Sequence, residues 1–203
     1  MQQTRLTVWL GIILSYGNGL AIADAQQDYA VGLETYESGN ATEAARWFGM
    51  AADQGFAEAQ LQLGSLYYKG QGVDQDFGQA LYWFTKAAEH GNAEAQTNLG
   101  YIYDKAMAGV QQDYKKAVAW YRKAAEQGYA SAQFDLGMMY YEGLGVAQDY
   151  IEAHKWLNLA ASNGHLDAAA SREHTEKRMT NAQIAEAQKR ASEWQAAFDK
   201  AHD

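Results

Sequence analysis

The sequence contains no cysteine and no proline among its 203 residues. Without cysteine there is no disulfide to stabilise the fold, and no thiol follows the apolar N-terminal stretch to carry a lipid. Without proline, no segment is barred from a helix by a fixed φ angle or a missing amide donor. The 19 glycines are therefore expected to mark the breaks between elements.

Positive charge is also scarce. The chain has 16 Lys and Arg against 25 Asp and Glu, which gives a formal net charge of −9. An acidic chain repels phosphate backbones, and no run of Lys or Arg counters this, so nucleic acid is excluded as an expected partner. The composition, 48% hydrophobic and 20% charged, is ordinary for a folded soluble protein.

The first 23 residues have the pattern of a secretory signal peptide. Arg5 precedes a short apolar stretch from Leu6 to Leu14, and Ala21-Ile22-Ala23 is a small-x-small site of the kind that signal peptidases cut. The stretch is too short for a stable bilayer anchor, although an uncleaved anchor and a buried helix are alternatives. We expect cleavage after Ala23, which removes one positive charge and leaves a periplasmic or secreted chain of net charge −10 without a stable membrane anchor.

Three segments of the chain are copies of one another, over residues 57–92, 93–129 and 130–165, with starts 36 and then 37 residues apart. In the first copy the shared residues are Leu63-Gly64, Tyr67, Gly72-Val73, Asp76, Trp83 and Gly91. Before them, Ala41 to Phe56 repeats only the second half, and after them Leu166 to Ala170 begins a copy and departs from it. Such a pattern is typical of a stacked array in which each unit buries its apolar face on its neighbours.

Each copy predicts two helices. Ala59, Leu63 and Tyr67 are four residues apart and share one face of the first helix. Gly64 recurs at the same place in every copy, which predicts a bulky neighbour close to the middle of that helix. The recurring aspartate is suited to cap the second helix, and Asp76 with Gln79 and Asp149 with Glu152 resemble capping boxes. The tryptophans of the second helices, Trp83, Trp120 and Trp156, are predicted to lie in the core.

The expected fold is all-α, an α/α superhelix (solenoid) of about three units with capping helices at both ends. Its parts are a signal peptide over 1–23, an N-terminal half-repeat cap over 24–56, the three repeats, and C-terminal capping helices over 166–203. Thr180 with Gln183 starts the last helix, whose apolar stripe consists of Ile184, Ala187, Ala191, Trp194 and Phe198. We expect this stripe to cover the end of the array, and pairing with a second copy of the chain is the alternative.

The motif between Ala57 and Gly91 reads Ala-x-Ala-Gln-x-x-Leu-Gly-x-x-Tyr, Gly-x-Gly-Val, Asp, Ala-x-x-Trp-(Tyr/Phe)-x-Lys-Ala-Ala and Gly. It resembles the Sel1-like repeat (SLR) family, which is related to the tetratricopeptide repeats, from Ala41 to about Ala170. The second copy departs from it, because Ala106-Met107-Ala108-Gly109 is one residue longer than the usual Gly-x-Gly. An extra surface residue in a bulged loop is the expected result.

The resemblance implies an adaptor, often in bacterial envelope regulation, polysaccharide export or motor assembly. Some exported members of that family are cysteine-rich and linked to β-lactam binding or hydrolysis. Since this chain has no cysteine, neither their disulfides nor that activity carry over.

Positions of the first helix that differ between copies are the candidate contacts with a partner. Steps of three and four residues put them opposite Ala59 and Leu63, and in tetratricopeptide-like stacking the first helices line the concave surface. For any single residue, a solvated face is the alternative. The candidates are Gln62, Ser65, Lys69, Asn98, Tyr101, Lys105, Phe134, Asp135, Met138 and Tyr141.

No group of residues has the spacing of a catalytic, cofactor or metal site. The five histidines lack ligand spacing, no serine lies in a nucleophile-elbow pattern, and no glycine cluster follows a strand. His154 occupies the place of Leu81 and Val118 in the other copies, so we expect half-buried packing there. The sequence thus predicts no enzymatic activity, no cofactor and no metal.

The sequence therefore predicts an exported, non-enzymatic adaptor that binds a protein or peptide through the concave face of the array, with a role in envelope assembly or regulation. A cell-wall or polysaccharide binder is the alternative, with Tyr68, Tyr101 and Tyr141 as platforms for sugar rings. A hydrolase is a third hypothesis, against which the missing catalytic constellation argues.

Overall fold

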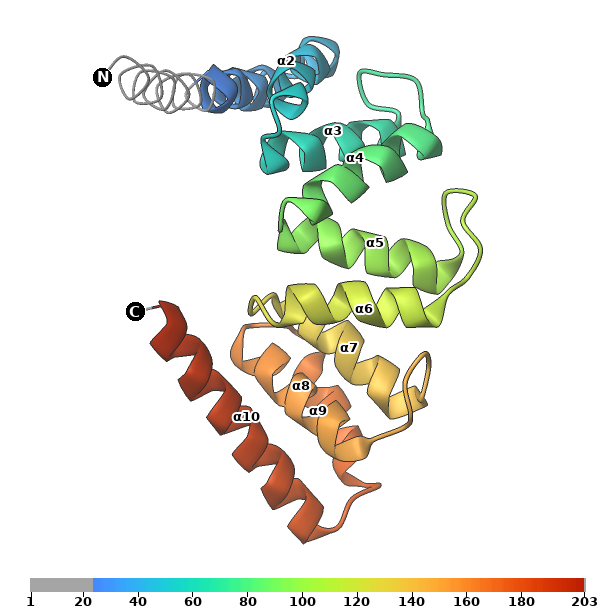
Figure 1. Cartoon of the computed structure of the whole chain (residues 1–203), viewed down its shortest axis with the longest axis vertical. Coiled ribbons are helices and arrows are strands. Elements are labelled where there is room, and N and C mark those ends of the chain that lie inside the picture. Colours follow the sequence, from blue (N-terminus) through green and yellow to red (C-terminus); the bar gives the residue numbers. More distant parts are fainter. Residues whose placement is uncertain (1–23, 203) are drawn as a thin grey trace, which may run out of the picture. The chain divides into compact units, whose positions relative to one another are not determined.

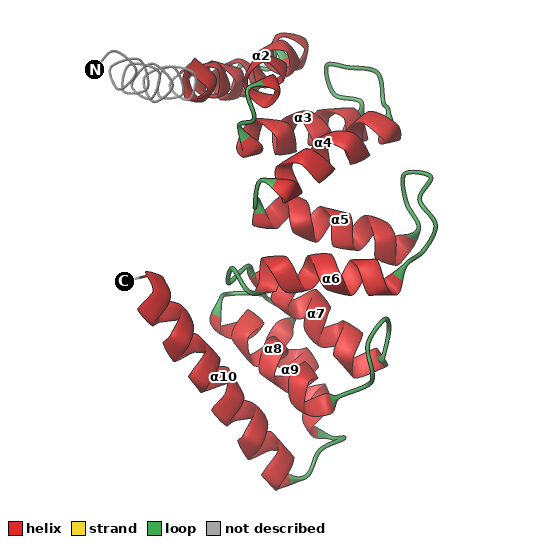
Figure 2. Ribbon diagram, in the orientation of Figure 1, coloured by secondary structure: helices red, strands yellow, loops and turns green. Residues whose placement is uncertain are grey.

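The structure, a computed structural model, describes residues 24–202 (Figure 1). Within that range the chain forms helices joined by loops and turns, without any strand (Figure 2). The chain divides into two compact units, one ending at Gly91 and the other beginning at Asn92. The expected all-α fold of paired helices is confirmed, whereas the predicted signal peptide over 1–23 lies outside the described residues.

The first unit contains a helical segment over 24–37, followed by α2 (Ala41–Asp53), α3 (Ala57–Lys69) and α4 (Phe77–Glu89). The ring of Tyr29 lies against Phe48 and Phe56, with centroids 5.7 and 5.1 Å apart. The segment from 24 to 56, where the sequence repeats only half a copy, therefore holds two helices that share a core.

The second unit contains α5 (Ala93–Lys105), α6 (Tyr114–Ala125), α7 (Ala130–Glu142), α8 (Tyr150–Ser162), α9 (Ala168–Glu176) and α10 (Asn181–His202). Each of the helices α5 to α8 packs on the next, and α8 also contacts both α9 and α10. The core includes the fully buried Tyr121 and Leu136 together with Trp156.

Each second helix starts at the aspartate that the sequence predicts as its cap. The carboxylates of Asp76, Asp113 and Asp149 accept backbone amides from Gln79 (2.9 Å), Lys116 (3.0 Å) and Glu152 (3.1 Å). In a full capping box the side chain three residues later would accept the backbone amide of the aspartate. Here that amide donates instead to a tyrosine carbonyl of the first helix. These carbonyls belong to Tyr67, Tyr103 and Tyr140.

The glutamine of the Ala-x-Ala-Gln motif is buried in every copy. Gln60 Nε2 donates to the carbonyl of Ala52 (3.0 Å) and Gln133 Nε2 to that of Ala125 (3.2 Å), which lie where the preceding second helix ends. Carbonyls there lack partners within their own helix. On the other side, the glutamine Oε1 atoms pair with the ends of the following second helices, at His90 (3.0 Å), Gln127 (2.8 Å) and Asn163 (2.9 Å).

The mid-helix glycines are close to bulky side chains, as predicted. A β-carbon on Gly64 would lie 2.8 Å from Cδ1 of Phe84, and one on Gly100 would lie 2.6 Å from Cδ1 of Tyr121. The prediction for the tryptophans is wrong in part. Trp156 is buried, but Trp83 and Trp120 are only half-buried, because one face of each second helix remains accessible.

The longer loop of the second copy has two alanines in the left-handed region, Ala106 at φ 55° and Ala108 at φ 56°. Ala106 caps α5 at the place where α3 and α7 use Gly70 (φ 65°) and Gly143 (φ 73°). A β-carbon in this conformation costs about 1–2 kcal/mol. The extra residue is therefore accommodated at the expense of local backbone strain.

The apolar stripe of α10 lies on α8 of the same chain. Trp194 contacts Trp156 with ring centroids 5.7 Å apart, and Arg190 Nη1 pairs with Glu152 Oε1 at 3.0 Å. Thr180 and Gln183 form a reciprocal capping box before α10, since the backbone amide of each is bonded to the side chain of the other. The predicted start of this helix is therefore confirmed.

The close approach at Gly64 leads to a stability prediction. We expect Gly64→Ala to lower the free energy of unfolding by about 1–3 kcal/mol, because the added methyl group overlaps the ring of Phe84. Gly49→Ala is the matched control, since Gly49 is also helical but has nothing within 4 Å of its β position. That variant should be more stable by up to about 1 kcal/mol. Urea denaturation followed by circular dichroism measures both, and equal effects of the two substitutions would contradict the packing argument.

Candidate functional site

The candidate contact residues of the first unit lie on α3. Gln62 and Ser65 are half-buried and Lys69 is exposed. The hydroxyl of Ser65 donates to the carbonyl of Leu61 at 3.0 Å, so it is engaged with its own helix. These three residues form a polar strip along α3, without an exposed apolar side chain among them.

In the second unit, α5 carries the most exposed of the candidates. Tyr101 is 47% exposed, Asn98 is half-buried, and Lys105 is exposed at the end of the helix. Lys105 Nζ forms an ion pair with Asp104 Oδ2 at 2.9 Å, and this bond raises the pKa of Lys105. Asp104, only 8% exposed, was not among the sequence-predicted residues.

The candidates on α7 are Phe134, Asp135, Met138 and Tyr141, all of them half-buried. The ring of Phe134 stacks on His165 with centroids 4.1 Å apart. Tyr141 contacts Tyr150 on α8 and His174 on α9, at centroid distances of 5.5 and 5.6 Å. The two aromatic candidates on α7 are thus largely engaged within the chain, which leaves Tyr101 as the exposed ring among the candidates.

Carboxylates gather between α5 and α7. Burial and the nearby Asp104 raise the pKa of Asp135 from 3.8 to about 6, while Lys105 acts in the opposite direction. Glu142, at the end of α7, is close enough to Lys105 to act on its pKa as well. We call Asp104, Asp135 and Glu142 the acidic group, and Lys105 is the ammonium that partly neutralises it.

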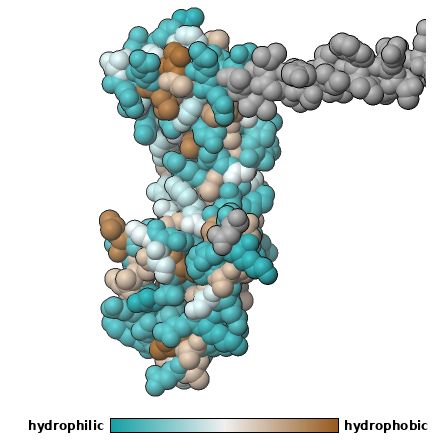
Figure 3. Space-filling view, turned by 90° about the vertical axis from the view of Figure 1, so that its left-hand side faces the viewer, coloured by the Kyte–Doolittle hydropathy of each residue, from teal (hydrophilic) through white to brown (hydrophobic). Residues whose placement is uncertain are grey.

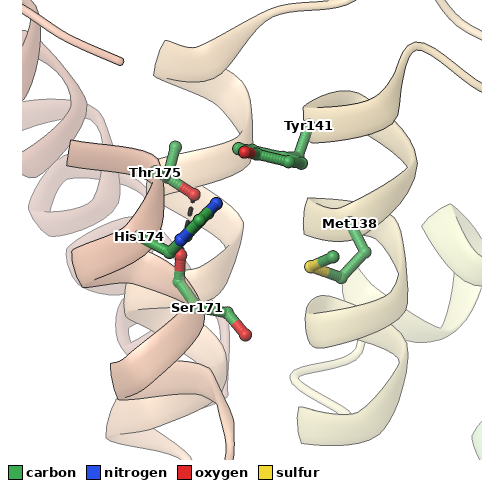
Figure 4. A pocket seen from close by; sticks show the side chains of 5 residues that line it. All are labelled: Met138, Tyr141, Ser171, His174 and Thr175. Atoms are coloured by element: carbon green, nitrogen blue, oxygen red, sulfur yellow. Dashed lines mark hydrogen bonds between the residues drawn. The ribbon is translucent and has the colours of Figure 1, made fainter. Parts of the chain in front are cut away.

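A small cavity of about 70 Å³ lies between α7 and α9. Met138 and Tyr141 project from α7 toward Ser171, His174 and Thr175 of α9 (Figure 4). Sequence reasoning missed the α9 residues, because the partial copy that begins at Leu166 departs from the repeat pattern after Ala170. Leu166 to Ala170, where a further copy begins, could have pointed to them, because α9 follows α8 at the place where the first helix of another repeat would stand.

Together these residues form one surface of the second unit, which we call the α5–α7–α9 surface. Electrostatic interactions join α5 to α7, and the cavity joins α7 to α9. Its members are Tyr101, Asp104, Lys105, Asp135, Met138, Tyr141, Glu142 and His174. Figure 3 shows one face of the molecule, on which hydrophilic residues predominate and hydrophobic residues form separate small groups.

The proposed sugar platforms differ in their surroundings. Tyr68 contacts Phe77 with centroids 5.6 Å apart and Tyr141 is packed as described, so Tyr101 alone of the three is exposed. A further exposed ring, Tyr82 on α4, is 51% exposed and was missed because its place holds alanine and lysine in the other copies.

The expectation for His154 is wrong, because its side chain is fully buried rather than half-buried. Its Nε2 pairs with Glu176 Oε1 at 2.9 Å, which links α8 to α9. Over residues 24–202, no three His, Asp or Glu side chains are grouped so that they could hold a metal ion. In the same range, no helix is both long and apolar enough to cross a bilayer.

The family model for the Sel1 repeat matches residues 23–56, 57–92, 93–129 and 130–165. The last three ranges are those found by self-comparison, and the first adds a repeat where the sequence had shown half a copy. No curated protein matches the chain.

Among solved structures, a Sel1 repeat protein from Oxalobacter formigenes is 34% identical with a TM-score of 0.66, over 73% of this chain and 60% of that one. A protective antigen of uropathogenic Escherichia coli strains, displaying an SLR fold, is 32% identical with a TM-score of 0.51, over 87% of this chain and 47% of its own. This chain therefore spans less than two thirds of either relative. Cysteine rich protein B of Helicobacter pylori shares the fold, at 24% identity and a TM-score of 0.51, over 63% of this chain and 91% of that one.

The environment of Asp135 predicts a pH dependence of stability. Because its pKa is higher in the folded chain than in the unfolded chain, its contribution is full below pH 3.8 and is lost as pH rises through about 6. Asp135→Asn should therefore raise the free energy of unfolding at pH 7 by about 1–2 kcal/mol, and this gain should vanish near pH 4. Denaturation at several pH values between 4 and 8 measures the difference.

The control for this measurement is Asp74→Asn, which removes the same charge from an exposed loop of the first unit. It should change stability little at any pH in that range. A difference between Asp135→Asn and the unmodified chain that stays constant from pH 4 to 8 would show that the carboxylate is not held as described.

Proposed function

The chain belongs to the Sel1 repeat family, and on that premise we propose that it is a non-enzymatic adaptor whose protein partner binds on the α5–α7–α9 surface. Sel1 repeats are scaffolds that generally bind protein partners. The observation that carries the assignment to this surface is the exposed ring of Tyr101, which lies within electrostatic reach of Lys105 and so near the acidic group, in the same unit as the α7–α9 cavity. Aromatic and methionine side chains of this kind give interfaces much of their contact area.

The residues of the fold and those of the surface are separable. The buried glutamines, the mid-helix glycines and the capping aspartates are alike in all copies and are engaged within the chain. Tyr101, Asp135 and Met138 differ from their counterparts in the other copies, and their side chains remain partly accessible. A surface that varies on a constant scaffold is suited to binding a partner, and its chemistry is suited to contact rather than to turnover.

We further propose that the adaptor works outside the cytoplasm, in the periplasm or as a secreted protein, and serves envelope assembly or regulation. The sequence pattern of residues 1–23 supports this location.

A cell-wall glycan is the second candidate ligand, and an observation in the first unit favours it. Tyr82 and Trp83, with ring centroids 4.9 Å apart, line a cavity of about 210 Å³ together with Asp53, Lys86 and His90. Aromatic faces with polar neighbours are suited to sugar rings. The candidate is second because none of the varied residues of α3, Gln62, Ser65 and Lys69, lines this cavity.

A photo-crosslinking amino acid at position 101 tests the adaptor function. In the tagged protein, produced in its native host, the crosslinker at Tyr101 should capture one dominant protein, and Met138→Ala should reduce that capture at least severalfold. Mass spectrometry identifies the product. The matched control is the crosslinker at Tyr82, a tyrosine of similar exposure on α4 (51% against 47%).

Capture at 82 but not at 101, together with retention on purified cell-wall glycan, would contradict the adaptor proposal and favour the second candidate. Equal capture at both positions would show that the contacts are not specific to the α5–α7–α9 surface.

The location has its own test. The intact mass of the protein recovered from the periplasm or the medium should correspond to a chain that starts at Asp24, because Ala21 and Ala23 meet the small-residue requirement of signal peptidase. Replacing Ala23 with arginine should block this processing, whereas Asp24→Asn should leave it intact. Recovery of the full-length chain in the cytoplasm would contradict the proposed export.

A further inference from the structure

The cavity between α7 and α9 limits what a partner can insert there. Its volume of about 70 Å³ exceeds the ~10–15 Å³ that a single water needs in a cavity. The hydroxyl of Thr175 donates to the carbonyl of Ser171 at 2.8 Å and is engaged within α9, while Met138 and Tyr141 supply an apolar wall (Figure 4). A short aliphatic side chain suits this space, because its wall is apolar.

The acidic group lies next to the cavity. Asp135 is three residues before Met138 on α7, so both side chains are on the same face of the helix. Lys105 is bound to Asp104 at 2.9 Å. Within residues 24–202, the carboxylate of Asp135 makes neither a hydrogen bond nor an ion pair, although its side chain is half-buried. A half-buried carboxylate that a neighbouring ammonium compensates only in part is suited to binding a further cation.

From this juxtaposition we propose that the partner segment carries a lysine or arginine close to a short aliphatic residue, the cation at Asp135 and the aliphatic side chain in the α7–α9 cavity. The inference rests on the proposed function, because it specifies the chemistry of the protein that binds the α5–α7–α9 surface. Charge complementarity selects the occupant, since Lys105 is paired with Asp104 at 2.9 Å and also lies within electrostatic reach of Asp135 and Glu142, so that one ammonium group serves three carboxylates.

The electrostatics of the unoccupied surface agree with this assignment. The raised pKa of Asp135 reports that burial and Asp104 oppose its negative charge more than Lys105 favours it. A cation from the partner would supply the missing compensation and lower that pKa. An acidic or phosphorylated segment would meet repulsion at the same place.

The test is a selection of displayed random twelve-residue peptides on the purified chain from residue 24 onward. Peptides enriched on the unmodified chain should carry Lys or Arg within one or two residues of Val, Ile or Leu. Asp135→Asn should lose the preference for the basic residue and bind a selected peptide at least about tenfold more weakly. Asp74→Asn, the matched control, should keep both the preference and the affinity. Circular dichroism checks that the variants have the same helix content.

A double-mutant cycle locates the contact. Changing the basic residue of a selected peptide to glutamine should cost about tenfold on the unmodified chain and little on Asp135→Asn. For the cavity, Ser171→Leu should fill the space and weaken binding, and shortening the aliphatic residue of the peptide to alanine should then cost nothing further.

The outcomes separate this inference from the function on which it rests. Peptides selected without a basic residue, or the same peptides selected on Asp135→Asn, would overturn the inference and leave the adaptor function in place. No enriched peptide on the unmodified chain, together with no protein captured at position 101, would overturn both.

Discussion

A buried glutamine amide joins α3 to α2 in the first unit and α7 to α6 in the second. Gln60 and Gln133 are 3% and 0% exposed, and each takes up a carbonyl at the end of the preceding second helix while its own oxygen is bonded at the end of the following one. A polar group buried at this depth without partners would cost about 1–3 kcal/mol. The pairing of α2 with α3 and of α6 with α7 therefore depends on this side chain. Glycines such as Gly64 allow the two helices of one repeat to approach closely.

The local parts of this scaffold could be predicted from the sequence, because their causes lie within one copy. Asp76, Asp113 and Asp149 cap helices that begin at the next residue, and the mid-helix glycines lie against the bulky side chains expected beside them. Contacts between residues that lie far apart in the sequence could not be predicted. Glu152 has the spacing of a capping box, but its carboxylate binds Lys155 and Arg190, the latter 38 residues away. Trp156 is buried where Trp120 is not, because α10 returns to cover α8.

The same difference between local and distant contacts explains which residues of the candidate surface could be predicted. Comparing copies was enough to find Tyr101, Asp135 and Met138, since each differs from its counterparts. Whether a ring is exposed depends on distant residues, so the engagement of Phe134 by His165 and of Tyr141 by His174 could not be read from periodicity. Asp104 did leave a signal, because it stands where the other copies have tyrosine, at Tyr68 and Tyr141. Its importance follows only from its burial and from its place beside Asp135.

A scaffold of this kind can hold side chains that its own stability does not favour. Asp135 lies half-buried near Asp104 with only partial compensation from Lys105. The fold tolerates this carboxylate because the helix contacts rest on other residues, the buried glutamines and the mid-helix glycines. A carboxylate that is compensated only in part discriminates between cationic and anionic partners more sharply than a solvated one, because water stabilises its negative charge less. Under the proposed function, the copy-to-copy differences on α5 and α7 would therefore set the selectivity for a partner, while the shared residues hold the helices that carry them in place.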